Sequence, residues 1–236
     1  MRRRSLGVLN KEELVSERIL RVEKLDPAGV VRVLEPFVND RRRARLLDVI
    51  GQRIGSIAVL FESPHDPHNG AAVLRTCEAF GIQRLHVIES REAFLAAASV
   101  ARGAEKWVDI VPHRTVEGAL DAAKTADLEL IATHPQGELA PEDLARIPRF
   151  ALVLGNERDG ISARLTAACP RAVRVPMRGF VESLNVSVTA AILLAGATHG
   201  RPGDLDEAAR LRLYARGLYL STSHADDLLA QAGFSV

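Results

Sequence analysis

The sequence predicts an α/β fold, in which a mostly parallel sheet carries helices on both faces. Short apolar or β-branched segments alternate with stretches of helical spacing over residues 56–200, a pattern typical of parallel strands joined by covering helices. With 236 residues and 47% hydrophobic content, the chain is long enough to bury a substantial core. We expect a basic helical N-terminal extension (1–55), a central domain (56–200) and a C-terminal helical extension (201–236).

The N-terminal extension is predicted to be helical because Leu, Val and Ile recur at helical spacing in two stretches. These are KEELVSERILRVEKL (11–25) and NDRRRARLLDVIGQRI (39–54). Either Asn39 or Asp40 is available as the N-cap of the second helix.

Six short apolar runs in the central domain are predicted strands, and most are separated by helical stretches. The strands are expected at 56–62, 84–89, 106–111, 128–133, 150–155 and 171–176. Helices are expected at 69–81, 115–126, 160–168 and 184–200, followed by two charged, peripheral helices in 203–236.

Charge is distributed unevenly along the chain. Residues 1–55 hold thirteen Lys or Arg against eight Asp or Glu, a local net charge of +5, so that the remainder carries −4 of the overall +1. This concentration, which includes Arg41, Arg42, Arg43 and Arg45, suits a polyanion such as RNA. A solvated helix face is the alternative interpretation. Aromatic residues are only 4% of the chain, which argues against a base-stacking platform and favours contact through phosphates.

Composition excludes several other classes of protein. The apolar runs are broken within about ten residues, too short to span a bilayer, and MRRRSLGVLNKEEL contains no apolar signal segment. We therefore expect a cytoplasmic protein with no membrane partner. Cys77 and Cys169 form no metal-binding or disulfide pattern, and both are expected in the core.

Ligands of such a sheet bind at the loops that leave the carboxyl ends of the strands. The first unusual loop, ESPHDPHN (62–69), leads into a helix that Asn69 is placed to cap and Gly81 to end. On this helix Val73, Cys77 and Phe80 share the expected core face.

Arg75 points away from that face and has alanines as helical neighbours, which would let another group approach closely. The alternative for Arg75 is a surface ion pair with Glu78, three residues along. His65, Asp66 and His68 suggest a metal site only weakly, because histidines between prolines are more often solvated or cap-like. We expect no bound metal.

The second loop, LVLGNERDGIS (152–162), has a GxxxxG spacing, but Ile161 follows where a phosphate-binding loop needs lysine. No GxGxxG occurs in the chain, so a dinucleotide fold has no support. A glycine, an asparagine and a glutamate remain at a strand end where they can face a pocket.

The third loop, VPMRGFVESLNVSVTAA (175–191), turns at Pro176 and Gly179. Ser183 or Asn185 can cap the helix that follows.

Taken together, the three segments NGAAVLRTCEAFG, LGNERDG and VPMRGFVESLNVSV resemble, in order, the three motifs of the SpoU (TrmH) RNA ribose 2′-O-methyltransferases of the SPOUT superfamily. PHN at 67–69, KWV at 106–108, ATH at 132–134 and the basic stretch before the first strand are similar to the TrmH branch. That branch methylates guanosine 18 in the D-loop of tRNA.

The resemblance implies a C-terminal deep trefoil knot and the cofactor S-adenosylmethionine. By motif position the cofactor pocket would be lined by Thr133, Gly155, Val175 and Leu184, with Met177 as an apolar wall. Backbone groups at these turns would read the adenine edge.

The resemblance also implies that Arg75 is catalytic, with Asn69, Glu157 and Asn185 as its polar support. Arginine is a poor base, since its pKa as a residue type lies above about 12. Two roles therefore stay open: a formal base helped by an RNA phosphate, or a cation that stabilises the developing alkoxide.

Members of this family are homodimers, so Arg75 is expected to reach the cofactor of the partner subunit. The basic run Arg41, Arg42, Arg43 and Arg45 would then bind the tRNA backbone. Two alternatives remain: ribosomal RNA as substrate, and a non-catalytic RNA-binding module with the same fold.

Overall fold

The computed structural model describes residues 11–64, 66–88, 103–156 and 158–235. The chain forms two compact units. One consists of residues 52–205, and the other joins the described residues up to Gly51 to those from Asp206 onward. The N-terminal and C-terminal helical extensions, which are far apart in the sequence, therefore belong to one compact unit.

The unit of residues 52–205 is built on a six-stranded sheet with the order β3-β2-β1-β5-β4-β6. All five pairs of neighbouring strands are parallel, which confirms the predicted fold class. The strands are β1 (Ile54–Glu62), β2 (Ile82–Ile88), β3 (Asp109–His113), β4 (Glu129–Thr133), β5 (Phe150–Leu154) and β6 (Arg171–Val173).

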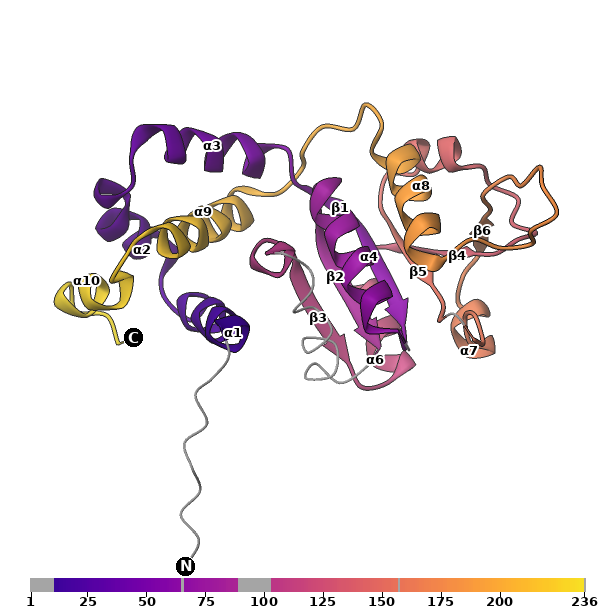
Figure 1. Cartoon of the computed structure of the whole chain (residues 1–236), viewed down its shortest axis with the longest axis horizontal. Helices are drawn as coiled ribbons and strands as arrows, with labels where there is room; N and C mark the ends of the chain where they lie inside the picture. The colour runs from indigo at the N-terminus through magenta and orange to yellow at the C-terminus, as the bar shows by residue number, and fades with distance from the viewer. Residues whose placement is uncertain (1–10, 65, 89–102, 157, 236) are drawn as a thin grey trace, which may run out of the picture. The chain divides into compact units, whose positions relative to one another are not determined.

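Helices cover both faces of this sheet (Figure 1). The face that includes Ile57, Val59 and Phe61 of β1 packs against α4 (Pro67–Ala79), η3 (Pro141–Arg146) and α8 (Val186–Thr198). Ala58 and Leu60 face the other side, where α6 (Val116–Thr125) and α7 (Ala163–Thr166) lie. Both faces of β1 are buried, which explains the uninterrupted apolar run of residues 57–61 within it. The short turn η2 (Ala104–Lys106) precedes β3.

The N-cap residues seen in the structure correct the expectation for one helix and resolve the alternatives left open for two others. Asn69 does not cap α4: Asp66 does, accepting a hydrogen bond from the amide of His68 at 2.8 Å. Pro67 occupies the first helical position, where its missing N–H costs nothing. Asn39, not Asp40, caps α3 (Asp40–Gly51) by accepting a hydrogen bond from the amide of Arg42 at 2.9 Å, and Asn185, not Ser183, caps α8.

Strand β6 has hydrogen-bonding neighbours on both sides. Its residue Val173 accepts a bond from the amide of His134 at 3.0 Å, just beyond β4. On the other side, Leu139 bonds to the backbone of residues 172 and 174, at 3.0 Å in each case. A Cβ on Gly137 would lie 2.7 Å from the carbonyl carbon of Val173. Only glycine lets the loop between β4 and η3 pass this close to β6.

The helical unit consists of α1 (Lys11–Val22), α2 (Pro27–Leu34), η1 (Glu35–Phe37), α3 (Asp40–Gly51), α9 (Glu207–Ser221) and α10 (Ala225–Gln231). Helix α9 packs against α1, α2 and α3. The expectation that the C-terminal helices are peripheral is wrong for α9, since Leu218 and Tyr219 are fully buried. Arg216 is also buried and pairs with Glu23, so its charge is compensated. No helix among the described residues has the length and apolar composition needed to cross a membrane.

Candidate functional site

Three of the predicted cofactor positions lie at one edge of the sheet. Thr133 is the last residue of β4 and pairs with Val173, the last residue of β6. Gly155 follows the end of β5, which is hydrogen-bonded to β4. Val175 lies two residues beyond β6 and packs against the main core. Neighbouring parallel strands thus bring Thr133, Gly155 and Val175 together at their carboxyl ends, where ligands of open α/β sheets bind.

The loop of residues 155–162 is held by many hydrogen bonds. The backbones of Asn156 and Gly160 exchange two bonds of 3.1 Å. The side-chain oxygen of Asn156 also accepts the amides of Arg158 at 2.9 Å and Asp159 at 2.7 Å. A Cβ on Gly155 would lie 2.1 Å from the carbonyl carbon of Gly160, so the turn closes this tightly only with glycine.

Glu62 anchors the far end of the same loop. It ends β1, is 6% exposed, and accepts a hydrogen bond from the amide of Ser162 at 2.7 Å. The sequence analysis did not single out this residue, although a carboxylate that directly follows the apolar run of residues 57–61 is a signal that could have identified it.

The loop of residues 175–184 is organised differently. None of its backbone groups hydrogen-bonds to any residue that the structure describes. The side chain of Phe180 is fully exposed, and Val181 is 61% exposed. Met177 and Leu184, two further predicted cofactor positions, also lie in this loop, with Leu184 36% exposed.

Two of the predicted polar residues join the first and third motifs. The side-chain amide of Asn185 donates a hydrogen bond of 2.9 Å to the side-chain oxygen of Asn69. Its own oxygen accepts the amide of Ser187 at 2.8 Å, as an N-cap. The starts of α4 and α8 are therefore linked. Glu157, the remaining predicted support, lies outside the described residues.

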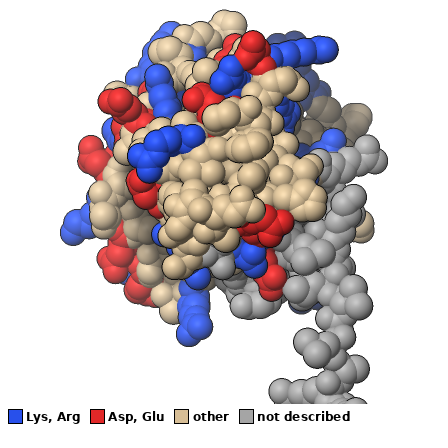
Figure 2. Space-filling view, turned by 90° about the vertical axis from the view of Figure 1, so that its left-hand side faces the viewer, with Lys and Arg blue, Asp and Glu red and all other residues tan. Residues whose placement is uncertain are grey.

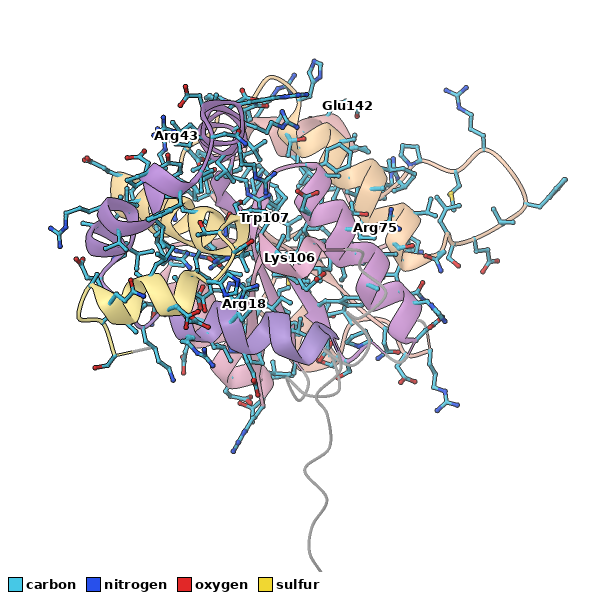
Figure 3. The ribbon with its side chains drawn as sticks, turned by 60° about the vertical axis from the view of Figure 1, so that its left-hand side comes forward. Arg18, Arg43, Arg75, Lys106, Trp107 and Glu142 are labelled. Carbon is cyan, nitrogen blue, oxygen red and sulfur yellow. The ribbon has the colours of Figure 1, made fainter. Side chains whose placement is uncertain are left out.

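Arg75 is exposed on α4 and forms no hydrogen bond or ion pair with any described residue. The alternative ion pair with Glu78 is not formed. Arg75 lines an open hollow of about 590 Å³ that Trp107 also lines. In Figure 3, Arg75, Lys106 and Trp107 lie near one another, while Glu142 lies apart toward the top of the view.

The hollow that Arg75 lines includes neither Gly155 nor Leu184. Among the described residues, no hydrogen bond joins the side chain of Arg75 to either of them.

The basic run on α3 is partly neutralised. Arg43 pairs with Asp40, and Arg45 with Asp48 at 3.0 Å. Arg42 donates to the hydroxyl of Ser221 at 3.1 Å, and Arg41 is exposed without a described partner. Blue and red side chains are interspersed on the face drawn in Figure 2. The net charge of the segment therefore overstates the number of its free cations.

Burial shifts the pKa of both thiols and of His86, in each case toward the neutral form. Burial raises the pKa of the Cys77 thiol to about 12 and that of Cys169 to about 11, so neither is a ready nucleophile. Burial lowers the pKa of His86 to about 4, with the nearby His113 contributing. The two rings stack, and their nitrogens lie 2.9 Å apart. The described residues contain no group of three or more His, Cys, Asp or Glu that could hold a metal ion.

Comparison with known proteins agrees with this arrangement. Residues 56–195 match the model of the SpoU rRNA Methylase family. The chain is 30% identical over 192 residues to the tRNA (guanosine(18)-2'-O)-methyltransferase of Escherichia coli (strain K12), covering 77% of this chain and 84% of that protein.

Two solved structures are also similar. The A. aeolicus TrmH/SpoU tRNA modifying enzyme has a TM-score of 0.65 and 25% identity, covering 78% of this chain and 98% of that chain. The SpoU methyltransferase AviRb from Streptomyces viridochromogenes, in complex with the cofactor AdoMet, has a TM-score of 0.55 and 26% identity, covering 66% and 61%. Because residues 56–195, more than half of this chain, match the family model, the chain belongs to the SpoU rRNA methylase family. It is an S-adenosylmethionine-dependent RNA methyltransferase.

Proposed function

We propose that this enzyme methylates the ribose 2′-hydroxyl of guanosine 18 in tRNA. The observation that carries the proposal is the convergence of Thr133, Gly155 and Val175 at adjoining strand ends, in a chain whose Arg75 has no partner among the described residues. The activity of the E. coli relative supports guanosine 18 as the target. A tRNA substrate places this activity in the cytoplasm.

The strand-end residues fit an adenosyl ligand. The backbone amides and carbonyls of residues 175–184 have no described partner and are free to bond to the adenine edge. Gly155 and Thr133 supply one wall, while Val175, Met177 and Leu184 supply apolar surface. When bound, S-adenosylmethionine provides a methyl group already activated on a sulfonium. The protein therefore has to position the ribose oxygen in line and assist the loss of its proton.

Arg75 is the group that we assign to the ribose oxygen. Its guanidinium has no described partner that would compete for it. A fixed cation beside the 2′-oxygen would stabilise the alkoxide as its proton leaves and would orient the adjacent phosphate. The other role, a formal base helped by that phosphate, remains the competing version.

A homodimer would bring Arg75 to the cofactor. The hollow that Arg75 lines includes none of the strand-end residues Thr133, Gly155 and Val175, and we propose that Arg75 of one subunit faces the cofactor site of its partner. The exposed side chains of Phe180 and Val181 would then be covered by the cofactor or the second subunit. Asn69 and Asn185 would hold the starts of α4 and α8 in register, with Glu157 as a third polar support.

The loop around β6 supports the proposal of a trefoil knot. The chain passes from His134, on the β4 side of β6, to Leu139 on the other side, an arrangement that fits threading of the later chain through this loop. Such threading is rare among proteins.

The helical unit would contact the tRNA backbone through α3. Arg41 is exposed and has no described partner, whereas Arg42, Arg43 and Arg45 would have to leave local partners to bind phosphate. Replacing these surface ion pairs by contacts with RNA phosphates costs little free energy, because each pair stabilises the fold by only about 0–1 kcal/mol. RNA binding should therefore depend steeply on salt.

Single-turnover methylation of a tRNA transcript, with the modified nucleotide mapped, tests the proposal. We expect Arg75→Ala to slow methylation at guanosine 18 by about 10²–10³-fold, as for other fixed transition-state donors. Arg114→Ala, which removes an exposed arginine without a described partner from the same unit, should leave the rate unchanged. An Arg75→Ala rate equal to wild type would remove Arg75 from the mechanism. A pH–rate profile displaced in Arg75→Lys would favour the base over the cation.

Ribosomal RNA is the second candidate substrate, since the matched family is described as an rRNA methylase family. Methylation of rRNA transcripts in preference to tRNA, in the same assay, would replace the tRNA assignment. Calorimetry that detected no binding of S-adenosylmethionine would instead favour a non-catalytic RNA-binding module.

A further inference from the structure

The hollow beside Arg75 has the composition of a nucleobase pocket. It measures about 590 Å³ and is lined by Ala72, Arg75, Thr76, Glu78, Phe80 and Trp107, among others. Its walls come from α4 and from the segment around η2, which lie in the same unit of the chain. Its volume falls within the usual range of small-molecule sites, about 300–1,000 Å³.

The position of the hollow follows from the chemistry proposed for Arg75. The 2′-oxygen and the base are attached to neighbouring carbons of one ribose. A guanidinium that contacts the 2′-oxygen therefore has the base of the same nucleotide within a few ångströms. Two of the side chains that line the hollow beside Arg75 are aromatic, Phe80 and Trp107. Enzymes that modify single nucleotides commonly take the nucleotide out of its stack and hold the base against such aromatic surfaces.

The polar atoms of the hollow select among the bases. Glu78 lines it and forms no hydrogen bond or ion pair through its side chain with any described residue. Thr76 already donates its hydroxyl proton to the carbonyl of Ala72 at 2.9 Å, so it offers only lone pairs. An ionised carboxylate accepts hydrogen bonds but donates none. Guanine presents two adjacent donors, N1–H and N2–H₂, whereas adenine presents an acceptor at N1.

We propose that this hollow receives the base of the nucleotide to be methylated, and that Glu78 recognises guanine through its N1–H and N2–H₂ groups. The inference rests on the proposed function, and it specifies how the enzyme selects the base of the nucleotide that it methylates. Arg75 and Glu78 would then contact the same nucleotide, Arg75 at the ribose and Glu78 at the base.

Base substitution at the methylated position tests the role of Glu78. We expect wild-type enzyme to methylate guanosine faster than inosine, which lacks the N2 amino group, by about tenfold, and adenosine more slowly still. Glu78→Gln should bring the guanosine-to-inosine ratio close to one. The matched control Glu142→Gln, an exposed glutamate of the same unit with no described partner, should retain the wild-type ratio.

Trp107 provides an independent readout because it is the only tryptophan of the chain. Binding of tRNA should change its fluorescence, and a tRNA that lacks the base at the target position should bind with little change. Trp107→Phe should keep most of the activity, while Trp107→Ala should lose about tenfold or more through lost stacking.

Three results would overturn the inference, and they can be told apart. Equal wild-type rates on guanosine and inosine, with methylation otherwise intact, would reject the base pocket and leave the proposed function standing. Glu78→Gln that yields monomers in sedimentation and slows all substrates equally would identify the hollow as a contact with a second copy of the chain. A wild-type enzyme that methylates no RNA, although it binds S-adenosylmethionine, would reject the proposed function and this inference with it.

Discussion

The two loops that bound the candidate cofactor site are held in opposite ways. In residues 155–162, Asn156 makes two backbone and two side-chain hydrogen bonds within the turn, and Glu62 fixes Ser162. In residues 175–184, no backbone group has a described partner, and Phe180 is fully exposed. The first loop has its shape before any ligand binds. The second has backbone groups that are available to a ligand or a partner subunit.

This difference indicates a division of labour within one site. A preformed wall lowers the entropy cost of binding, because its groups are already ordered. A loop with free amides and carbonyls gains hydrogen bonds only when its ligand arrives, and it orders at that moment. Substitutions in the first loop should therefore change folding stability, and substitutions in the second should change ligand affinity.

The largest effect is expected from Gly155→Ala. Its Cβ would lie 2.1 Å from the carbonyl carbon of Gly160, and backbone cannot yield as a flexible side chain can. We expect the free energy of unfolding to fall by about 1–3 kcal/mol or more, measured by urea denaturation. Gly179→Ala is the matched control, because a Cβ there would meet no atom within 4 Å. Equal destabilisation by both substitutions would contradict the difference between the loops.

A smaller effect is expected from Asn156→Ala. The substitution removes the side-chain oxygen that accepts the amides of Arg158 and Asp159. We expect a loss of about 1–2 kcal/mol in the free energy of unfolding. Ser183→Ala, in the second loop, removes a hydroxyl with no described partner and should change that free energy by less than about 0.5 kcal/mol. A larger loss from Ser183→Ala than from Asn156→Ala would reverse the comparison.

The smallest effect on stability is expected from Phe180→Ala. The side chain is fully exposed, so the free energy of unfolding without ligand should change by less than about 0.5 kcal/mol. The added thermal stability that saturating S-adenosylmethionine gives to wild type should be reduced in the variant, since ligand stabilisation follows affinity. A Phe180→Ala protein as strongly stabilised by the cofactor as wild type would show that this residue plays no part in binding.

Local patterns in the sequence predict the sheet and the three loops. The central strands β1 and β5 stand out because both of their faces are buried and each contains a continuous apolar run. The strand-end positions follow from the strands themselves. The cap of α4 was also readable, since Asp66 before Pro67 is the usual start of a helix with proline in its first turn; Asn69 instead binds Asn185.

Contacts between distant parts of the chain could not be read in this way. Nothing local to α9 indicates that it packs with α1, α2 and α3 across more than 150 intervening residues. Helical spacing permits both the Arg43–Asp40 pair, which forms, and an Arg75–Glu78 pair, which does not. Which of the two forms depends on the surrounding side chains, and that information is tertiary. The hollow around Trp107 likewise combines α4 with a segment about 30 residues later.

Hydrogen–deuterium exchange with and without S-adenosylmethionine tests most directly whether these loops form one cofactor site. We expect the hydrogen-bonded amides of the first loop, those of Asn156, Arg158, Asp159, Gly160 and Ser162, to be protected in both states. The amides of residues 177–184 should exchange freely until saturating cofactor is added and should then slow. Unchanged exchange in residues 177–184 at saturating cofactor would contradict the account, because the free backbone groups of that loop would then have no part in holding the ligand.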